Sequence, residues 1–193
     1  MSARQVPTIQ TLVDRNKTYA QTHKPLPPLM GEDGKPRPNP GVLIVTCVDP
    51  RIHPEQFLHF GGQFMGEEKP PLQMPMVRNI GGRAGRAITD IVGLDAVFGI
   101  KQVMVVHHTD CGMTYGTDEG MRKATKDRVP EKYWKEIDEW KFGEIKDLKQ
   151  SVVEDIKVLK DSPFVRDEIV VRGFIFDVKD GSMEEVTLEK ERL

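Results

Sequence analysis

Short hydrophobic runs alternate along this chain with polar, glycine-rich and proline-rich breaks. The run GVLIVTC at residues 41–47 is rich in β-branched residues and ends in a turn, a pattern typical of a strand that is buried on both faces. The runs MPMVRNI at 74–80 and KQVMVVHH at 101–108 have the same character and predict two more strands. Because such strands occur mainly in parallel sheets, the pattern favours a parallel sheet.

Helical spacing of apolar residues separates or follows these strands. Residues 84–98 present an apolar face and predict a crossover helix that ends at Gly99. A helical turn is predicted at 53–60, and residues 131–160 carry apolar positions at helical spacing that predict core packing beneath a charged, solvated face. Strand, helix and strand in this order predict an α/β fold with right-handed crossovers.

The two ends of the chain have their own patterns. Residues 8–20 predict a short amphipathic helix, and the proline-rich stretch 23–40 predicts a connector without regular structure. We therefore expect a helical arm and connector at 1–40 and a single α/β domain at 41–193. Near the end of the chain, DEIVVRGFIFDV and MEEVTL predict two strands joined by a hairpin at Asp180-Gly181.

Composition excludes several classes of function. The 193 residues are 38% hydrophobic, and 28 Lys and Arg against 30 Asp and Glu give a net charge of -2, so nothing favours binding of nucleic acid or an anionic membrane. A small neutral or anionic substrate fits this charge better. No apolar run approaches the roughly 18 residues of a membrane span, and the first residues lack the apolar core of a secretory signal. We expect a cytoplasmic protein, with a mitochondrial location as the alternative because no acidic residue precedes Asp14.

The chain has two cysteines, and each ends a predicted strand. Cys47 lies in VTCVDPR and Cys111 in VVHHTDCG. In a reducing compartment a structural disulfide is not favoured, so both thiols are available as ligands or nucleophiles. Ligands of parallel sheets bind beyond the carboxyl ends of the strands, and both clusters are predicted at that edge.

These residues suit a zinc ion. His108 and Cys111 are three apart on a turn, and zinc accepts nitrogen and sulfur ligands together. Cys47 supplies a third ligand, which leaves one position open, as in catalytic sites. Consecutive strand residues point to opposite faces, so only one of His107 and His108 faces the metal; the pattern favours His108. We expect the other to be a core histidine that donates to a backbone carbonyl.

Asp49 and Arg51 add a charged pair to the first cluster. Separated by one residue in a turn, they can form a two-pronged hydrogen bond that holds the carboxylate, which could then accept a proton from a zinc-bound water. The alternative is an ordinary salt bridge of the turn. Beside a zinc thiolate, the catalytic interpretation is favoured.

The motifs CVDPR at 47–51 and HTDCG at 108–112 resemble the Cys-x-Asp-x-Arg and His-x-x-Cys motifs of the β-class carbonic anhydrases. VRNIGG at 77–82 is similar to the Arg-Asn-Ala-Gly segment of that family. HHTDCGM and RGFIFDV are more similar to a short branch that includes carbonyl sulfide hydrolases. The resemblance extends from about Gly41 to RGFIFDV.

This resemblance implies a fold, a site and an activity. The fold would be a core of about four parallel strands with an added antiparallel strand, flanking helices and an N-terminal helical arm that embraces the partner in a homodimer or homotetramer. One zinc per chain would be held by the ligands Cys47, His108 and Cys111, with Asp49 and Arg51 as the catalytic dyad. The enzyme would be a zinc lyase that reversibly hydrates carbon dioxide to bicarbonate and a proton by zinc-bound hydroxide. The alternative is a carbonyl sulfide hydrolase that gives hydrogen sulfide and carbon dioxide.

One position departs from the family pattern. Pro50 stands where the family usually has Ser or Ala, so a backbone N–H is lost and Asp49 is biased towards an extended conformation. In some family members the aspartate swings onto zinc as a fourth ligand, and Asp49 is open to this too.

Three other functions compete with this hypothesis. GGRAGR at 81–86 follows a strand and opens a helix, as phosphate-binding loops do, but it matches neither standard glycine motif. A thiol redox protein would use Cys47 and Cys111, although the chain has no C-x-x-C. A noncatalytic zinc protein would need a fourth ligand, Asp49 or His107.

Overall fold

The computed structural model describes residues 6–25, 28, 30–34, 41–60 and 74–188. The chain divides into two compact units, Met1–Arg37 and Pro38–Leu193. In the first unit, helix α1 spans Ile9–Ala20 and confirms the helix predicted at 8–20. It begins after Thr8, whose side chain accepts a hydrogen bond from the N–H of Thr11. The predicted connector lies largely outside the described residues.

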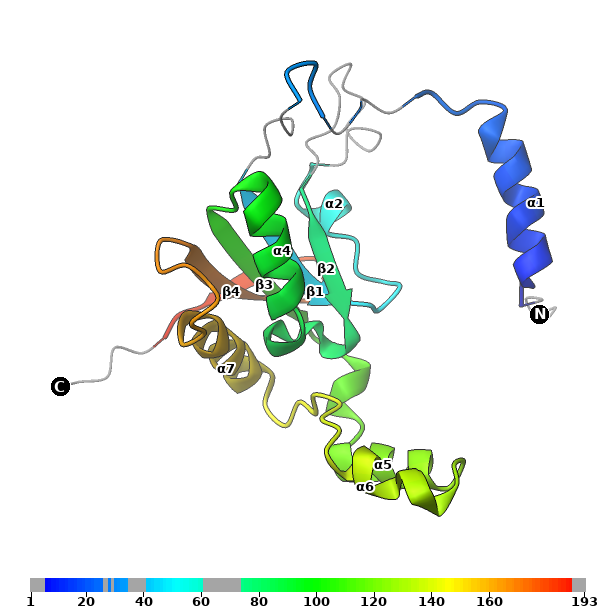
Figure 1. Ribbon diagram of the computed structural model, residues 1–193, viewed down its shortest axis with the longest axis vertical. Coiled ribbons are helices and arrows are strands. Elements are labelled where there is room, and N and C mark those ends of the chain that lie inside the picture. Colours follow the sequence, from blue (N-terminus) through cyan, green and yellow to red (C-terminus); the bar gives the residue numbers. More distant parts are fainter. Residues whose placement is uncertain (1–5, 26–27, 29, 35–40, 61–73, 189–193) are drawn as a thin grey trace. The chain divides into compact units, whose positions relative to one another are not determined.

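The second unit is built on a five-stranded sheet in the order β2-β1-β3-β4-β5 (Figure 1). The strands are β1 Val42–Cys47, β2 Met76–Asn79, β3 Gln102–His108, β4 Val170–Phe176 and β5 Met183–Val186. Strands β1 to β4 are parallel, and β5 pairs antiparallel with β4. This arrangement confirms the predicted fold class.

Helices cover both faces of the sheet (Figure 1). Helices α4 (Ile88–Phe98) and α7 (Leu148–Lys160) contribute to one core cluster, together with alternate residues of β1 and β3. The short helix α2 (Pro54–Phe57) packs into a second cluster with the other set of strand residues. Two buried layers explain why β1 consists almost entirely of apolar residues. Within the described residues, no helix is long and apolar enough to span a membrane.

Strand β4 and helix α7 approach each other closely at Gly173. A Cβ atom on Gly173 would lie 2.3 Å from Cγ1 of Val152 and 2.7 Å from Cδ1 of Ile156. Glycine is therefore needed here because the helix occupies the space that any side chain would fill.

The crossover helix predicted at 84–98 begins later than expected. Its first residues form a 3₁₀ turn, Ala84–Arg86, and α4 begins at Ile88. The side-chain amide of Asn79 donates to the carbonyl of Arg83 at 3.0 Å and accepts from its N–H at 2.8 Å. Because these bonds hold Arg83 in an extended conformation, regular helix starts only after the turn. The predicted end at Gly99 is confirmed, with φ of 65°.

The helical pattern predicted at 131–160 is confirmed only in part, because the helix is not continuous. A 3₁₀ turn and α6 (Trp134–Asp138) are followed by an irregular segment before α7 starts at Leu148. Gly143 has φ of 91°, which is incompatible with a continuous helix, and the carboxylate of Asp147 caps α7 by accepting from the N–H of Gln150 at 2.7 Å.

Helix α5 (Asp118–Lys126) was not predicted. It lies in the same part of the chain as α6, between β3 and α7 (Figure 1). Few large apolar residues mark its sequence, so hydrophobic spacing gave little signal.

Candidate metal centre

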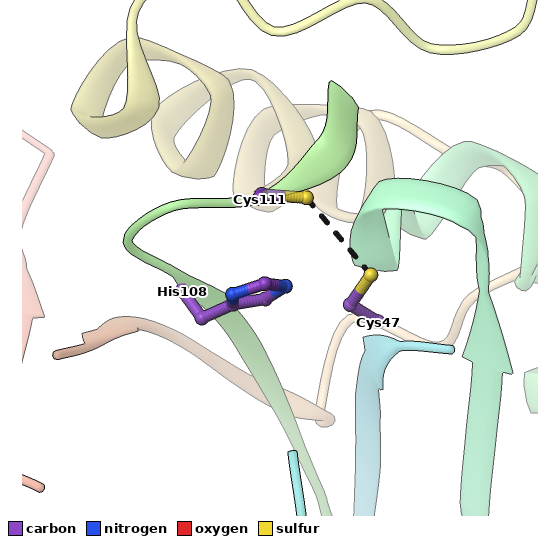
Figure 2. A group of neighbouring side chains, drawn as sticks. All are labelled: Cys47, His108 and Cys111. Carbon is purple, nitrogen blue, oxygen red and sulfur yellow. Dashed lines mark hydrogen bonds between the residues drawn. The ribbon is translucent and has the colours of Figure 1, made fainter. Parts of the chain in front are cut away.

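Two neighbouring parallel strands deliver the candidate site. Strand β1 ends at Cys47 and strand β3 at His108, so both side chains lie at the carboxyl edge of the sheet. The turn after β3 then brings in Cys111. One ligand atom from each residue lies within 4.8 Å of the others, and all three residues are buried (Figure 2). The structure thus brings together the three side chains predicted to bind zinc.

The donor atoms of this group suit zinc. Nδ1 of His108 lies 2.9 Å from the carbonyl oxygen of Thr109, which fixes the ring. Nε2 is buried and has no hydrogen-bond partner among the described residues. Figure 2 shows the ring facing the two sulfur atoms, which are 3.9 Å apart. Zinc accepts one imidazole nitrogen and two thiolate sulfurs as ligands, and the nitrogen here has no other partner in the part of the chain that the structure describes. Because zinc is usually four-coordinate, three ligands would leave one coordination position open.

The two thiols influence each other's ionisation. The pKa of Cys47 is lowered, chiefly because the thiol of Cys111 donates to its sulfur, and burial opposes this effect. The neighbouring His108 ring and the N–H groups of Asp49 and Gly81 also lower the pKa of Cys47. The same sulfur–sulfur contact raises the pKa of Cys111, as does burial. Cys47 is therefore the first of the two to become a thiolate.

The two glycines of VRNIGG lie next to Cys47. Gly82 has φ of 68°, and a Cβ atom there would lie 3.0 Å from the backbone nitrogen of Cys47. A side chain at this position would both strain the backbone and push the end of β1. The segment that resembles the family motif therefore shapes the backbone around Cys47.

Asp49 and Arg51 form the predicted two-pronged pair. Nε of Arg51 donates to Oδ1 of Asp49 at 3.0 Å, and Nη2 donates to Oδ2 at 2.7 Å. The backbone N–H of Arg51 also donates to Oδ1, at 2.9 Å. Hydrogen bonds from Arg51 lower the pKa of Asp49 to about 2, against the opposing effect of burial. Oδ2 of this ionised carboxylate lies 3.9 Å from Nε2 of His108.

Arg78 supports the turn that carries the pair, a role that the sequence did not reveal. Its Nε donates to the carbonyl of Cys47 at 3.1 Å, and its Nη2 donates to the carbonyls of Asp49 and Ile52, both at 2.8 Å. Strand β2 therefore fixes the loop after β1 through one guanidinium. The only sequence signal was the position of Arg78 in VRNIGG.

His107 points to the opposite face of the sheet, as predicted. Its Nδ1 lies 2.8 Å from Oγ of Ser151, and its Nε2 lies 2.9 Å from Oδ2 of Asp155, both on α7. The expectation that it donates to a backbone carbonyl was wrong, because a buried serine and carboxylate face it. With both ring nitrogens occupied, His107 is turned away from the metal centre.

In the glycine-rich segment 81–86, Arg83 forms ion pairs with two carboxylates of α7. Nε of Arg83 lies 3.1 Å from Oδ2 of Asp155, and Nη2 lies 3.1 Å from Oε2 of Glu154. Two carboxylates beside this guanidinium oppose the binding of a phosphate.

Comparison with known proteins identifies relatives of this chain. No family model matches it. It is 28% identical to β-carbonic anhydrase 1 of Mycobacterium tuberculosis over 155 residues, which cover 78% of this chain and 84% of that protein. The crystal structure of a carbonic anhydrase from Streptococcus mutans matches with a TM-score of 0.73 and 27% identity, covering 95% of this chain and 100% of that one. Over most of its length, the chain is similar to a β-class carbonic anhydrase.

A second kind of relative acts on a sulfur compound. The carbon disulfide hydrolase of Acidithiobacillus thiooxidans is 25% identical over 181 residues, 84% of this chain and 79% of that protein. The resemblance to β-class carbonic anhydrases inferred from the motifs is therefore confirmed, and it extends to enzymes of sulfur substrates.

Proposed function

We propose that this protein is a zinc enzyme that reversibly hydrates carbon dioxide to bicarbonate and a proton. One observation carries the proposal: an unpartnered, buried Nε2 of His108 faces two cysteine sulfurs, with the ionised carboxylate of Asp49 3.9 Å from that nitrogen. Cys47, His108 and Cys111 would hold the ion. Zinc, when bound, supplies a Lewis acid that makes water a nucleophile at neutral pH, as it does in the unrelated carbonic anhydrases that hold their zinc with three histidines.

Asp49 would orient the nucleophile. Because its pKa is lowered to about 2, it carries no proton at neutral pH and can only accept a hydrogen bond. Arg51 holds the plane of the carboxylate through both oxygens. An accepted hydrogen bond would direct a lone pair of the attacking oxygen towards the carbon of the substrate.

The pairing of Asp49 also argues against a closed, noncatalytic zinc site. As a fourth ligand, this carboxylate would have to leave two hydrogen bonds from the Arg51 guanidinium. His107, the other candidate for a fourth ligand, is held by Ser151 and Asp155. An open coordination position is therefore the better description.

The proposal includes a homo-oligomer, a dimer or tetramer. Within the first unit, helix α1 has no buried residue, and its Ile9 is 83% exposed and its Leu12 51% exposed. An apolar helix face of this kind is stabilised when a partner covers it. Light scattering of the purified protein measures the assembly, and a monomer at all concentrations contradicts this part.

The test of the main proposal compares two matched aspartates. Asp49→Asn removes the charge beside the metal centre, whereas Asp95→Asn removes a carboxylate that Arg166 holds in the same two-pronged way, outside the site. We expect about one zinc per chain in all proteins and a fall of at least about 100-fold in kcat/KM for Asp49→Asn alone. Zinc content far below one per chain, or full activity of Asp49→Asn, contradicts the proposal.

A sulfur substrate is the second candidate, favoured by the relationship to a carbon disulfide hydrolase. Attack of water on carbonyl sulfide would give carbon dioxide and hydrogen sulfide at the same residues. Measuring kcat/KM for carbon dioxide, carbonyl sulfide and carbon disulfide on one preparation decides between them. A preference for carbon dioxide by orders of magnitude eliminates the second candidate.

A further inference from the structure

The guanidinium of Arg51 is held from two sides. Besides its bonds to Asp49, its Nη1 donates to Oδ2 of Asp110 at 2.6 Å, and its Nη2 donates to the backbone carbonyl of Asp110 at 2.8 Å. Asp110 stands between His108 and Cys111 in the sequence. The turn that delivers a candidate metal ligand therefore also holds the partner of Asp49.

Asp110 is itself fixed by its backbone and by a tyrosine. Its φ of 56° lies in the left-handed region, which Asp tolerates better than most residues and which helps to set the direction of its carbonyl. The hydroxyl of Tyr115 donates to Oδ1 at 2.5 Å, so the two carboxylate oxygens have different partners. A continuous chain of hydrogen bonds runs from Tyr115 through Asp110 and Arg51 to Asp49.

We propose that Asp110, supported by Tyr115, is a positioning residue that holds the Arg51 guanidinium in the plane in which it orients Asp49. This inference rests on the proposed function, because it assigns Asp110 a role in orienting the catalytic carboxylate. Asp110 acts through Arg51, so it is not itself a catalytic residue.

The exposure of Arg51 explains why a second support matters. Its side chain is 49% exposed, and an isolated exposed ion pair contributes little because solvent competes and side-chain freedom is lost. The side chain of Asp110 is itself 47% exposed, so its pairing energy is small as well, and its contribution is geometric. With Asp49 bound along one edge and Asp110 along another, the planar guanidinium has fewer orientations open to it. Without Asp110, the guanidinium would keep one carboxylate partner and gain freedom to turn towards water.

Asp110 and Tyr115 can be substituted conservatively without disturbing the fold. Asn also adopts the left-handed conformation, so Asp110→Asn removes the charge and keeps the backbone geometry. Tyr115→Phe removes one hydroxyl from a side chain that is 77% exposed. Glu185→Gln is the matched control, since it removes the carboxylate that receives Nε of Arg172 at 2.8 Å on β4 and β5.

The activity test uses the zinc-loaded full chain. We expect Asp110→Asn to lower kcat for carbon dioxide about 10-fold with little change in KM, because a charge-assisted bond to the positioning group is lost. Tyr115→Phe should cause a smaller fall, and Glu185→Gln none. Zinc content should stay at about one per chain. Wild-type kcat in Asp110→Asn overturns the inference.

A double variant separates positioning from an independent role. If Asp110 acts through Arg51 and Asp49, Asp49→Asn with Asp110→Asn should be no slower than Asp49→Asn alone. If the double variant instead loses activity by the product of the two single-variant factors, the inference is overturned and the proposed function still stands. Should Asp49→Asn itself cost no activity, the proposed function fails, and this inference fails with it.

A spectroscopic measurement tests the contact without activity. In metal-free protein, the Nε–H signal of Arg51 should be sharp and slow to exchange in the wild type, and should shift and broaden in Asp110→Asn. The same signal should be unchanged in Glu185→Gln. An unchanged Arg51 signal in Asp110→Asn overturns the inference.

Discussion

Sγ of Cys47 lies 3.9 Å from Sγ of Cys111, although 64 positions separate the two residues. Neighbouring parallel strands and one turn bring them together, and each is at most 4% exposed. In a zinc-loaded protein both sulfurs would be ligands. Without the ion, they form a dithiol held at close range.

Removal of metal should therefore make these thiols oxidisable as a pair. After treatment with a chelator, oxidised glutathione should take two electrons and release two reduced glutathione molecules as a Cys47–Cys111 disulfide forms. Mass spectrometry should show the loss of two hydrogens and of both free thiols. Zinc-loaded protein should resist the same treatment. Stable glutathione adducts on both cysteines, or equal oxidation with zinc present, contradict this prediction.

Substitution of His108 should lower zinc binding, whereas substitution of His107 should lower stability. His108→Asn removes the unpartnered ring nitrogen and should leave zinc content well below one per chain. His107→Asn breaks buried bonds to Ser151 and Asp155 and should retain zinc, with the free energy of unfolding lowered by about 1–3 kcal/mol. Metal analysis and urea unfolding of both variants measure these effects. Equal zinc loss in the two variants contradicts the assignment.

The central sheet and the grouping of Cys47, His108 and Cys111 were predictable because their signals are local. A run such as GVLIVTC identifies a buried strand without knowledge of its neighbours, and parallel strands share one edge. A shared edge places Cys47, His108 and Cys111 at the same end of the sheet, and the pairing of β1 with β3 brings them together. The opposite orientations of His107 and His108 followed from the two-residue period of a strand.

The errors arose where distant contacts decide the structure. Nothing in hydrophobic spacing shows that Gly143 adopts a φ of 91° and interrupts the helix predicted at 131–160. The second partner of Arg51 escaped prediction because Asp110 lies 59 positions away on another turn. The partners of His107 were missed for the same reason, since α7 supplies them.

A methyl group at Gly173 should destabilise the fold. Because the added Cβ would overlap Val152 and Ile156, we expect Gly173→Ala to lower the free energy of unfolding by about 1–3 kcal/mol. Gly93→Ala in α4 is the control, since a Cβ there meets nothing within 4 Å. It should be neutral or stabilising by up to about 1 kcal/mol. Urea unfolding measures both variants, and equal stability of the two refutes the packing argument.

Because Asp95 pairs with Arg166, the free energy of unfolding should fall as acid protonates Asp95. Nε and Nη2 of Arg166 donate to the two carboxylate oxygens of Asp95 at 2.7 and 2.8 Å. These bonds hold the pKa of Asp95 below its ordinary value of 3.8, so the folded state binds fewer protons there than the unfolded state. The contribution is therefore complete above the ordinary pKa and is lost as pH falls towards the lowered one.

Asp95→Asn isolates this contribution, because an amide does not ionise in this range. Near neutral pH the variant should be less stable than the wild type by about 1 kcal/mol. As the pH falls below 3.8, protonation removes the charge in the wild type too, so the difference should shrink. Urea unfolding of both proteins at about pH 6 and about pH 3 measures it. A difference that stays constant would show that the carboxylate contributes through packing, because only the charge is lost on protonation.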